Sequence, residues 1–136
     1  MHDIAFLAAR VMLAVIFILS GFGKLMAVAG IAGMLQKAGM PQPQMLGYAV
    51  GILELVAGIL VLVGFFTRWA ALALAAFTIA TIFVAHNFWV FEGQQYMAQR
   101  TQALKNIAMA GGLLLLAFTG PGGLSVDART RRASWR

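Results

Sequence analysis

Long apolar stretches, interrupted by only a few polar residues, occur four times along the chain. They cover residues 4–26, 46–66, 69–91 and 104–118. A helix needs about 20 mostly apolar residues to cross the hydrocarbon core of a bilayer. The first three stretches reach that length, and the fourth reaches it when its polar flanks snorkel to the interface. The pattern therefore predicts an all-α membrane protein, a four-transmembrane-helix bundle in one domain of residues 1–136.

The connections between these stretches differ in length and polarity. Residues 66–69 leave room only for a tight turn, so the second and third spans form an antiparallel hairpin. Residues 29–40 have an apolar side and predict a short interfacial helix that ends before Pro41, because the residue before a proline disfavours helix. Residues 92–103 hold four glutamines and are predicted to form a polar connection that faces water.

The composition excludes an ordinary soluble domain. Hydrophobic residues make up 62% of the chain and charged residues 10%, with a mean hydropathy of +0.88, whereas soluble domains are about 25% charged. The chain has no cysteine, which excludes disulfides, thiolate metal sites and dithiol chemistry of its own. Four of its ten Lys and Arg residues lie in the last eight positions. A basic tail, residues 120–136, beside a span favours anionic lipid headgroups over nucleic acid.

Basic residues near the ends of the spans predict the orientation of the chain in the membrane. With both termini in the cytoplasm, the inside holds Arg68 and the arginine-rich tail, and Arg10 lies close by. The outside then holds Lys37 and Arg100. We therefore expect a multi-pass protein whose N and C termini are both cytoplasmic.

Five polar residues from four different spans fall in the outer half of the bilayer in this topology. Ionisable groups inside spans are costly and usually face the bundle interior or water. Glu54, the deepest of them, lies about 12 Å below the outer start of its helix. An unpaired carboxylate at that depth becomes protonated or pairs with a cation. The alternatives are snorkelling of the two lysines, capping by the histidine and helix–helix packing by the asparagine. The five residues are Lys24, Glu54, His86, Lys105 and Asn106.

Two further features predict packing. Gly47 and Gly51 have the small-xxx-small spacing that lets membrane helices approach closely. At the cytoplasmic end, Arg10 lies about one and a half turns into the first span, and Asp127 follows the turn after the last. We expect Arg10 and Asp127 to form a structural ion pair that attaches the tail to the bundle, with a cytoplasmic substrate site as the alternative.

Taken in order, these motifs resemble the DoxX family of small four-helix proteins of the bacterial inner membrane. The resemblance covers nearly the whole chain, and the arginine-rich tail departs from it. It implies a bacterial inner-membrane location and a link to redox chemistry, because some relatives resemble the membrane subunit of a thiosulfate:quinone oxidoreductase and others associate with thiol-redox proteins. The matching positions are Arg10, 20–25, 38–41, Gly51, Glu54, Gly58, 64–68, 86–89, 105–106, 111–114, 120–122, Ser125 and Asp127.

The leading functional hypothesis is a redox-associated membrane subunit that binds a quinone near the outer leaflet. Glu54 and His86 are the candidate catalytic residues: Glu54 exchanges a proton with the quinone, and His86, a side chain that titrates near neutrality, relays it outward. The two lysines keep the carboxylate charged or stabilise an anionic ligand such as thiosulfate. The candidate ligand-binding residues are Lys24, Asn87, Trp89, Lys105 and Asn106.

Two other classes of function remain open. The chain contains no phosphate-binding loop, no metalloprotease or nucleophile-elbow motif, and no pair of histidines spaced for heme. No heme, flavin or metal is therefore expected, and the electrons must come from a partner or from the substrate. The second hypothesis is a non-catalytic accessory or scaffold subunit, with a partner subunit or a homo-oligomer as its assembly. The third is a small transporter or lipid-handling protein.

Overall fold

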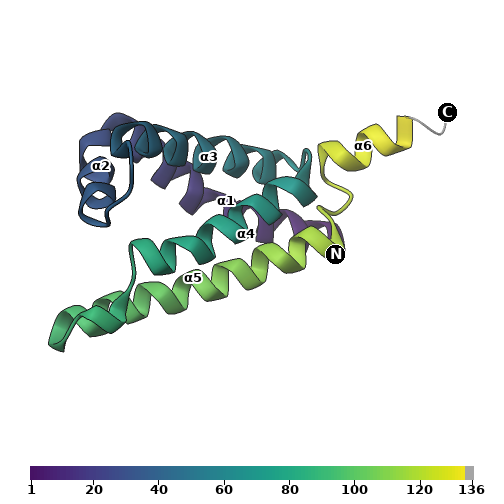
Figure 1. Cartoon of the computed structure of the whole chain (residues 1–136). Coiled ribbons are helices and arrows are strands. Elements are labelled where there is room, and N and C mark those ends of the chain that lie inside the picture. The colour runs from purple at the N-terminus through teal and green to yellow at the C-terminus, as the bar shows by residue number, and fades with distance from the viewer. Residues whose placement is uncertain (134–136) are drawn as a thin grey trace.

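The computed structural model describes residues 1–133, so the last three residues of the predicted basic tail lie outside it. The described chain is all-helical (Figure 1). Four of its helices are long and apolar enough to cross a membrane, which confirms the predicted fold class. The elements are α1 (His2–Met26), α2 (Val28–Lys37), α3 (Pro43–Val63), α4 (Thr67–Val84), η1 (Phe88–Val90), α5 (Gly93–Thr119) and α6 (Val126–Ala133).

The long helices are arranged as two pairs. Helix α1 packs along α3, and α4 packs along α5, while α3 and α4 are joined by a tight turn. Figure 1 shows that the two pairs converge at the end that carries the N-terminus and α6 and diverge toward the end that carries α2. The short helix α2 packs on α3 at this open end, as the predicted interfacial helix after the first span. We call the two ends the terminal end and the open end.

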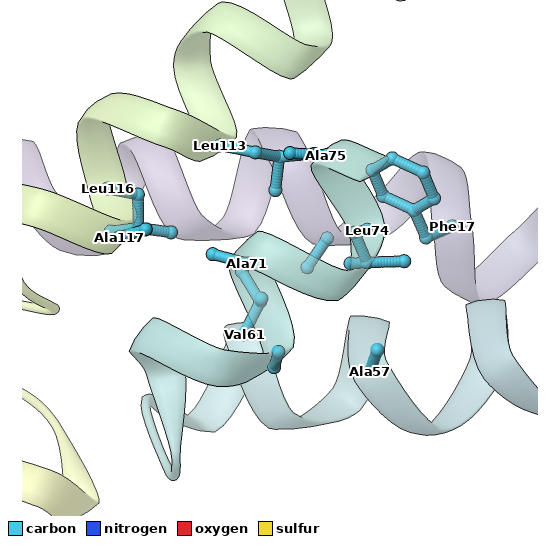
Figure 2. Packing of buried hydrophobic residues seen from close by; sticks show 11 residues of the cluster. Phe17, Ala57, Val61, Ala71, Leu74, Ala75, Leu113, Leu116 and Ala117 are labelled. Atoms are coloured by element: carbon cyan, nitrogen blue, oxygen red, sulfur yellow. The ribbon is translucent and has the colours of Figure 1, made fainter. Parts of the chain in front are cut away.

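A cluster of eleven buried apolar residues fills the space between the four long helices (Figure 2). Six of the eleven are alanines. Lipid tails are as apolar as the helix surfaces, so membrane helices associate through close van der Waals packing, which small side chains permit. The large members, among them Phe17, Leu74 and Leu113, fill the gaps between the closely spaced backbones.

Helices α1 and α3 approach each other most closely where glycines meet. A Cβ atom on Gly21 would lie 2.5 Å from the Leu55 amide nitrogen and 2.7 Å from the Gly51 carbonyl oxygen. One on Gly58 would lie 3.2 Å from the Cβ of Phe17. The two glycines of the predicted small-xxx-small motif face different helices. Gly51 packs on α1, and Gly47 packs on α2.

The helices of the last two spans differ from their predicted ranges, although α4 and the turn after it together form a candidate span, Thr67–Val90, close to the predicted 69–91. Helix α4 ends at Val84 rather than near residue 91, and a single 3-10 turn follows it. The segment 92–103, predicted to be a loop, instead forms the first turns of α5. Its glutamines, alanines, methionine and arginine are all good helix formers, and polarity alone does not prevent a helix. At 27 residues, α5 is about 40 Å long, so it extends beyond a hydrocarbon core of about 30 Å.

The tail is attached to the bundle, although not by the predicted ion pair. The Asp127 carboxylate accepts hydrogen bonds from the Phe66 and Thr67 amides, both 3.0 Å long, and from the Thr67 hydroxyl at 2.8 Å. The buried Arg10 guanidinium instead donates to the Leu124 carbonyl oxygen. No Arg10–Asp127 salt bridge forms between these two described residues. The unpaired N–H groups at the start of α4 attract the carboxylate, which caps that helix from a distant part of the sequence.

Substitution of Gly21 tests the close approach of α1 and α3. We expect Gly21→Ala to lower the free energy of unfolding by about 1–3 kcal/mol, because its methyl group would overlap the α3 backbone. Gly23→Ala is the matched control, since nothing lies within 4 Å of its Cβ position and alanine is the better helix former. Thermal unfolding of both variants in detergent measures the difference. Equal stability of the two variants would contradict the packing described here.

Candidate functional site

A cavity of about 810 Å³ lies between the two helix pairs at the open end. All four long helices and α2 contribute to its walls, which are mostly apolar. Its volume falls in the range of about 300–1,000 Å³ that is common for small-molecule sites. The polar residues that line it are Ser20, Lys24, Glu54, Thr78, Thr81, His86, Gln102, Lys105 and Asn106.

One wall of the cavity carries a buried ion pair. Lys24 Nζ lies 2.5 Å from Glu54 Oε2 and donates to Ser20 Oγ at 2.6 Å. The Ser20 hydroxyl lies 3.2 and 3.3 Å from the two carboxylate oxygens. The Glu54 side chain is only 6% exposed, and that of Lys24 is 25% exposed. A carboxylate can remain charged at this depth because a cation and a hydroxyl replace its lost hydration.

The positions of these three residues follow from local sequence. Ser20 and Lys24 are four residues apart, so they lie on the same face of α1. The glycine contact between α1 and α3 brings that face within reach of Glu54, since a Cβ on Gly21 would lie only 3.0 Å from the Cβ of Glu54. The close helix approach therefore positions the ion pair.

The opposite wall is held together by uncharged hydrogen bonds. The Asn106 amide nitrogen donates to Thr81 Oγ1 at 2.8 Å and to the Thr78 carbonyl oxygen at 3.4 Å. The Thr81 hydroxyl donates to the same carbonyl at 2.7 Å. Asn106 therefore joins α5 to α4, as the packing alternative proposed, and also lines the cavity. Thr78 is 2% exposed, and its hydroxyl has no hydrogen-bond partner in the described structure.

The open end of the cavity holds His86 and Lys105. His86 follows the C-terminal end of α4, and its Nδ1 lies 2.9 Å from Oε1 of Gln99. Lys105 lies on α5 and forms no salt bridge with any described residue. Trp89 does not line the cavity and packs on the Phe88 ring, with the ring centroids 5.3 Å apart. Asn87 is also outside the lining.

The structure thus brings five of the seven candidate site residues to one cavity. These are the five intramembrane polar residues, and their roles in binding or catalysis stay predictions. Several polar neighbours in the cavity were not predicted from the sequence. Ser20 lies four residues before Lys24, and Thr78 and Thr81 have an i, i+3 spacing, so both patterns could have indicated them. Gln99 could not have been indicated in this way, because its segment was predicted to be a loop.

Titratable residues are too dispersed for a metal centre in the part of the chain that the structure describes. Within residues 1–133, no three His, Asp or Glu side chains are grouped to hold a metal ion. Among the residues that the structure describes, Glu54 is the only acid that lines the cavity, and its carboxylate is hydrogen-bonded to Lys24 and Ser20. The polar chemistry of this site therefore consists of an ion pair, hydroxyls, amides, one imidazole and one further ammonium group.

Comparison with known proteins identifies the family. The sequence profile of the DoxX family matches residues 5–87, more than half of the chain. The chain belongs to the DoxX family. The matched range runs from α1 to the residues that follow α4 and includes Lys24, Glu54 and His86. The α5 wall of the cavity lies outside it.

Similarity to whole relatives extends the DoxX assignment over nearly the full chain. Inner membrane protein YphA of Escherichia coli is 35% identical over 128 residues, which cover 94% of this chain and 91% of YphA. Inner membrane protein YqjF of the same organism is 37% identical over 127 residues, which cover 93% of this chain and 92% of YqjF. An uncharacterised membrane protein of Mycobacterium tuberculosis is 29% identical over 134 residues, which cover 92% of this chain and 81% of that protein. No solved structure matches this chain. By homology, the chain is a multi-pass protein of the inner membrane.

The Lys24–Glu54 pair can be tested by a double-mutant cycle. We expect Lys24→Met to destabilise the protein by about 3 kcal/mol, because it leaves a buried carboxylate without its cation. Glu54→Gln should cost less, since Lys24 is partly exposed and its ammonium can turn toward the interface. The double variant Lys24→Met/Glu54→Gln should be more stable than Lys24→Met alone. Thermal unfolding in detergent measures all three.

Lys105→Met is the matched control for this cycle. It removes the same charge from the same cavity, but from a lysine without a salt bridge to any described residue. We therefore expect a change within about 0.5 kcal/mol. Strictly additive effects of Lys24→Met and Glu54→Gln would show that the two side chains do not interact, and would contradict the ion pair.

Proposed function

We propose that the cavity binds an amphipathic ring compound of the quinone class and that this DoxX-family chain is the quinone-binding membrane subunit of a redox system. The observation that carries the proposal is the combination of apolar walls with the polar cluster of Ser20, Lys24 and the buried Glu54. The volume of about 810 Å³ suits a ring and the first part of a hydrophobic tail. The apolar walls suit the ring and tail, and the hydrogen-bond donors suit the ring oxygens.

In this proposal the chain supplies binding and proton exchange. Reduction of a quinone to a quinol consumes two electrons and two protons, and a partner subunit delivers the electrons. Glu54 is the proton-exchanging group of the polar cluster, and Ser20 connects its carboxylate to Lys24 through hydrogen bonds. When Glu54 takes up a proton, its attraction for Lys24 weakens, and the ammonium is free to turn toward an anionic ligand oxygen. His86, at the open end, exchanges protons with the aqueous side.

Quinone retention tests the proposal directly. We expect protein purified from native membranes in mild detergent to contain a nearly stoichiometric total of quinone and quinol, and Glu54→Gln and His86→Ala to lower that total. Lys37→Gln is the control, because it removes an exposed charge from α2 without altering the lining of the cavity. Extraction and chromatography measure the quinone, and thermal unfolding confirms that each variant is folded. Equal trace amounts in all four proteins would contradict the proposal and favour the accessory-subunit hypothesis.

We propose further that both termini are cytoplasmic and that the cavity lies in the outer half of the bilayer. The N-terminus and α6 lie at the same end of the bundle (Figure 1). Arg68, at the start of α4, and helix α6 of the arginine-rich tail lie at that end, and short basic segments beside spans stay in the cytoplasm. The cavity, at the opposite end, then faces the outer leaflet.

The absence of native cysteine allows a clean test of this orientation. Gln95 and Thr130 are both exposed, at the open end and on α6 respectively. In intact spheroplasts, we expect a membrane-impermeant maleimide to label Gln95→Cys, and to label Thr130→Cys only after lysis. The cysteine-free parent protein is the blank for the labelling. The reverse pattern would place both termini outside and the cavity in the inner leaflet.

A further inference from the structure

Gln99 holds the imidazole ring that lines the open end of the cavity. His86 lies two residues beyond the last residue of α4, and its Nδ1 is 2.9 Å from Oε1 of Gln99 on α5. Both side chains are partly buried. Of these two residues, only His86 lines the cavity. Gln99 therefore contacts the ring from outside the cavity lining and orients it.

The hydrogen bond specifies where the proton of the ring sits. A glutamine side-chain oxygen can only accept a hydrogen bond, so with the Gln99 amide oxygen turned toward the ring Nδ1 is the donor. A neutral imidazole with a proton on Nδ1 has its lone pair on Nε2, which makes Nε2 an acceptor. Gln99 presents its side-chain oxygen to Nδ1 at 2.9 Å.

We propose that Gln99 is a positioning residue that fixes His86 in the Nδ1–H tautomer, so that Nε2 accepts a hydrogen bond from a hydroxyl group of the ligand. The part that concerns the ligand rests on the proposed function. A quinol carries hydroxyl groups, whereas the corresponding quinone carries only carbonyl oxygens and cannot donate to Nε2. His86 therefore selects the reduced, hydroxyl-bearing form of the ligand. Lys24, on the other wall, donates two of its three N–H groups to Ser20 and Glu54, and the third suits a ring oxygen of either form.

The histidine content makes the tautomer directly measurable. The chain has two histidines, His2 and His86, so His2→Gln leaves one imidazole to observe. We expect the full-length His2→Gln protein, labelled with 15N-histidine and measured in bilayers at a pH where the ring is neutral, to show a protonated Nδ1 and an unprotonated Nε2. An Nε2–H ring in this protein would overturn the proposal.

Variants of Gln99 separate positioning from a merely structural role. Gln99→Leu removes the acceptor, and we expect the ring to shift to the Nε2–H tautomer that free histidine prefers in water. Gln99→Glu keeps an acceptor oxygen and should retain the Nδ1–H form. Gln95→Leu makes the same change one helical turn earlier, at an exposed position, and should leave the ring unchanged. An unchanged tautomer in Gln99→Leu would overturn the assignment of Gln99.

Ligand titration completes the test and distinguishes its failure from that of the proposed function. Under anaerobic conditions, a short-chain 1,4-benzoquinol should move the Nε2 resonance of His86, and the matching benzoquinone should not. Binding of both forms without any effect of the quinol on Nε2 would overturn the selection by His86 and leave the quinone site standing. Binding of neither form would overturn both the ligand part of this inference and the proposed function. The tautomer measurement is independent of either result.

Discussion

The close approach of α1 and α3 is the contact on which the site depends. A bilayer gives helices no hydrophobic reason to associate, so their backbones must come near enough for dispersion forces to act. Gly21 and Gly51 make this possible, because a methyl group at either position would overlap an atom of the facing helix. The same contact sets the distance between Lys24 and Glu54, which pair at 2.5 Å. A wider separation of the helices would leave a carboxylate in the membrane interior without its cation, at a cost of several kcal/mol.

The two ends of the bundle are built differently, and this difference creates the cavity. At the terminal end, alanine-rich packing closes the core, and the tail links the two helix pairs through polar contacts. Asp3 on α1 accepts a 2.6 Å hydrogen bond from the Gly123 amide, Arg10 donates to the Leu124 carbonyl, and Asp127 caps α4. At the open end, the helix pairs diverge, and α2 packs mainly on α3, with a smaller contact to α1. The gap that remains is lined by apolar side chains and by the intramembrane polar residues.

Much of this arrangement could be predicted from sequence, for physical reasons that also explain the errors. The spans are predictable because a helix that crosses a bilayer must be long and apolar. The convergence of Lys24 and Glu54 is predictable because an isolated charge is too costly inside the membrane. The helical start of α5 was missed because its glutamines indicate exposure to water, not the absence of a helix. The Arg10–Asp127 pair was wrong because simple charge matching ignores competing partners. The amides of Phe66 and Thr67 donate to the Asp127 carboxylate, and the Arg10 guanidinium donates to the Leu124 carbonyl oxygen.

The polar side-chain contacts at the cavity lie within each helix pair, and this determines which new contacts a ligand could add. Lys24, Ser20 and Glu54 connect α1 to α3, whereas Asn106 connects α5 to α4. No side-chain hydrogen bond between described residues crosses the open end from one pair to the other. A ligand that reaches both walls would therefore form the first polar link between the two pairs at that end. The energy of that link would oppose the divergence of the helices, so occupancy and helix spacing at the open end should be coupled.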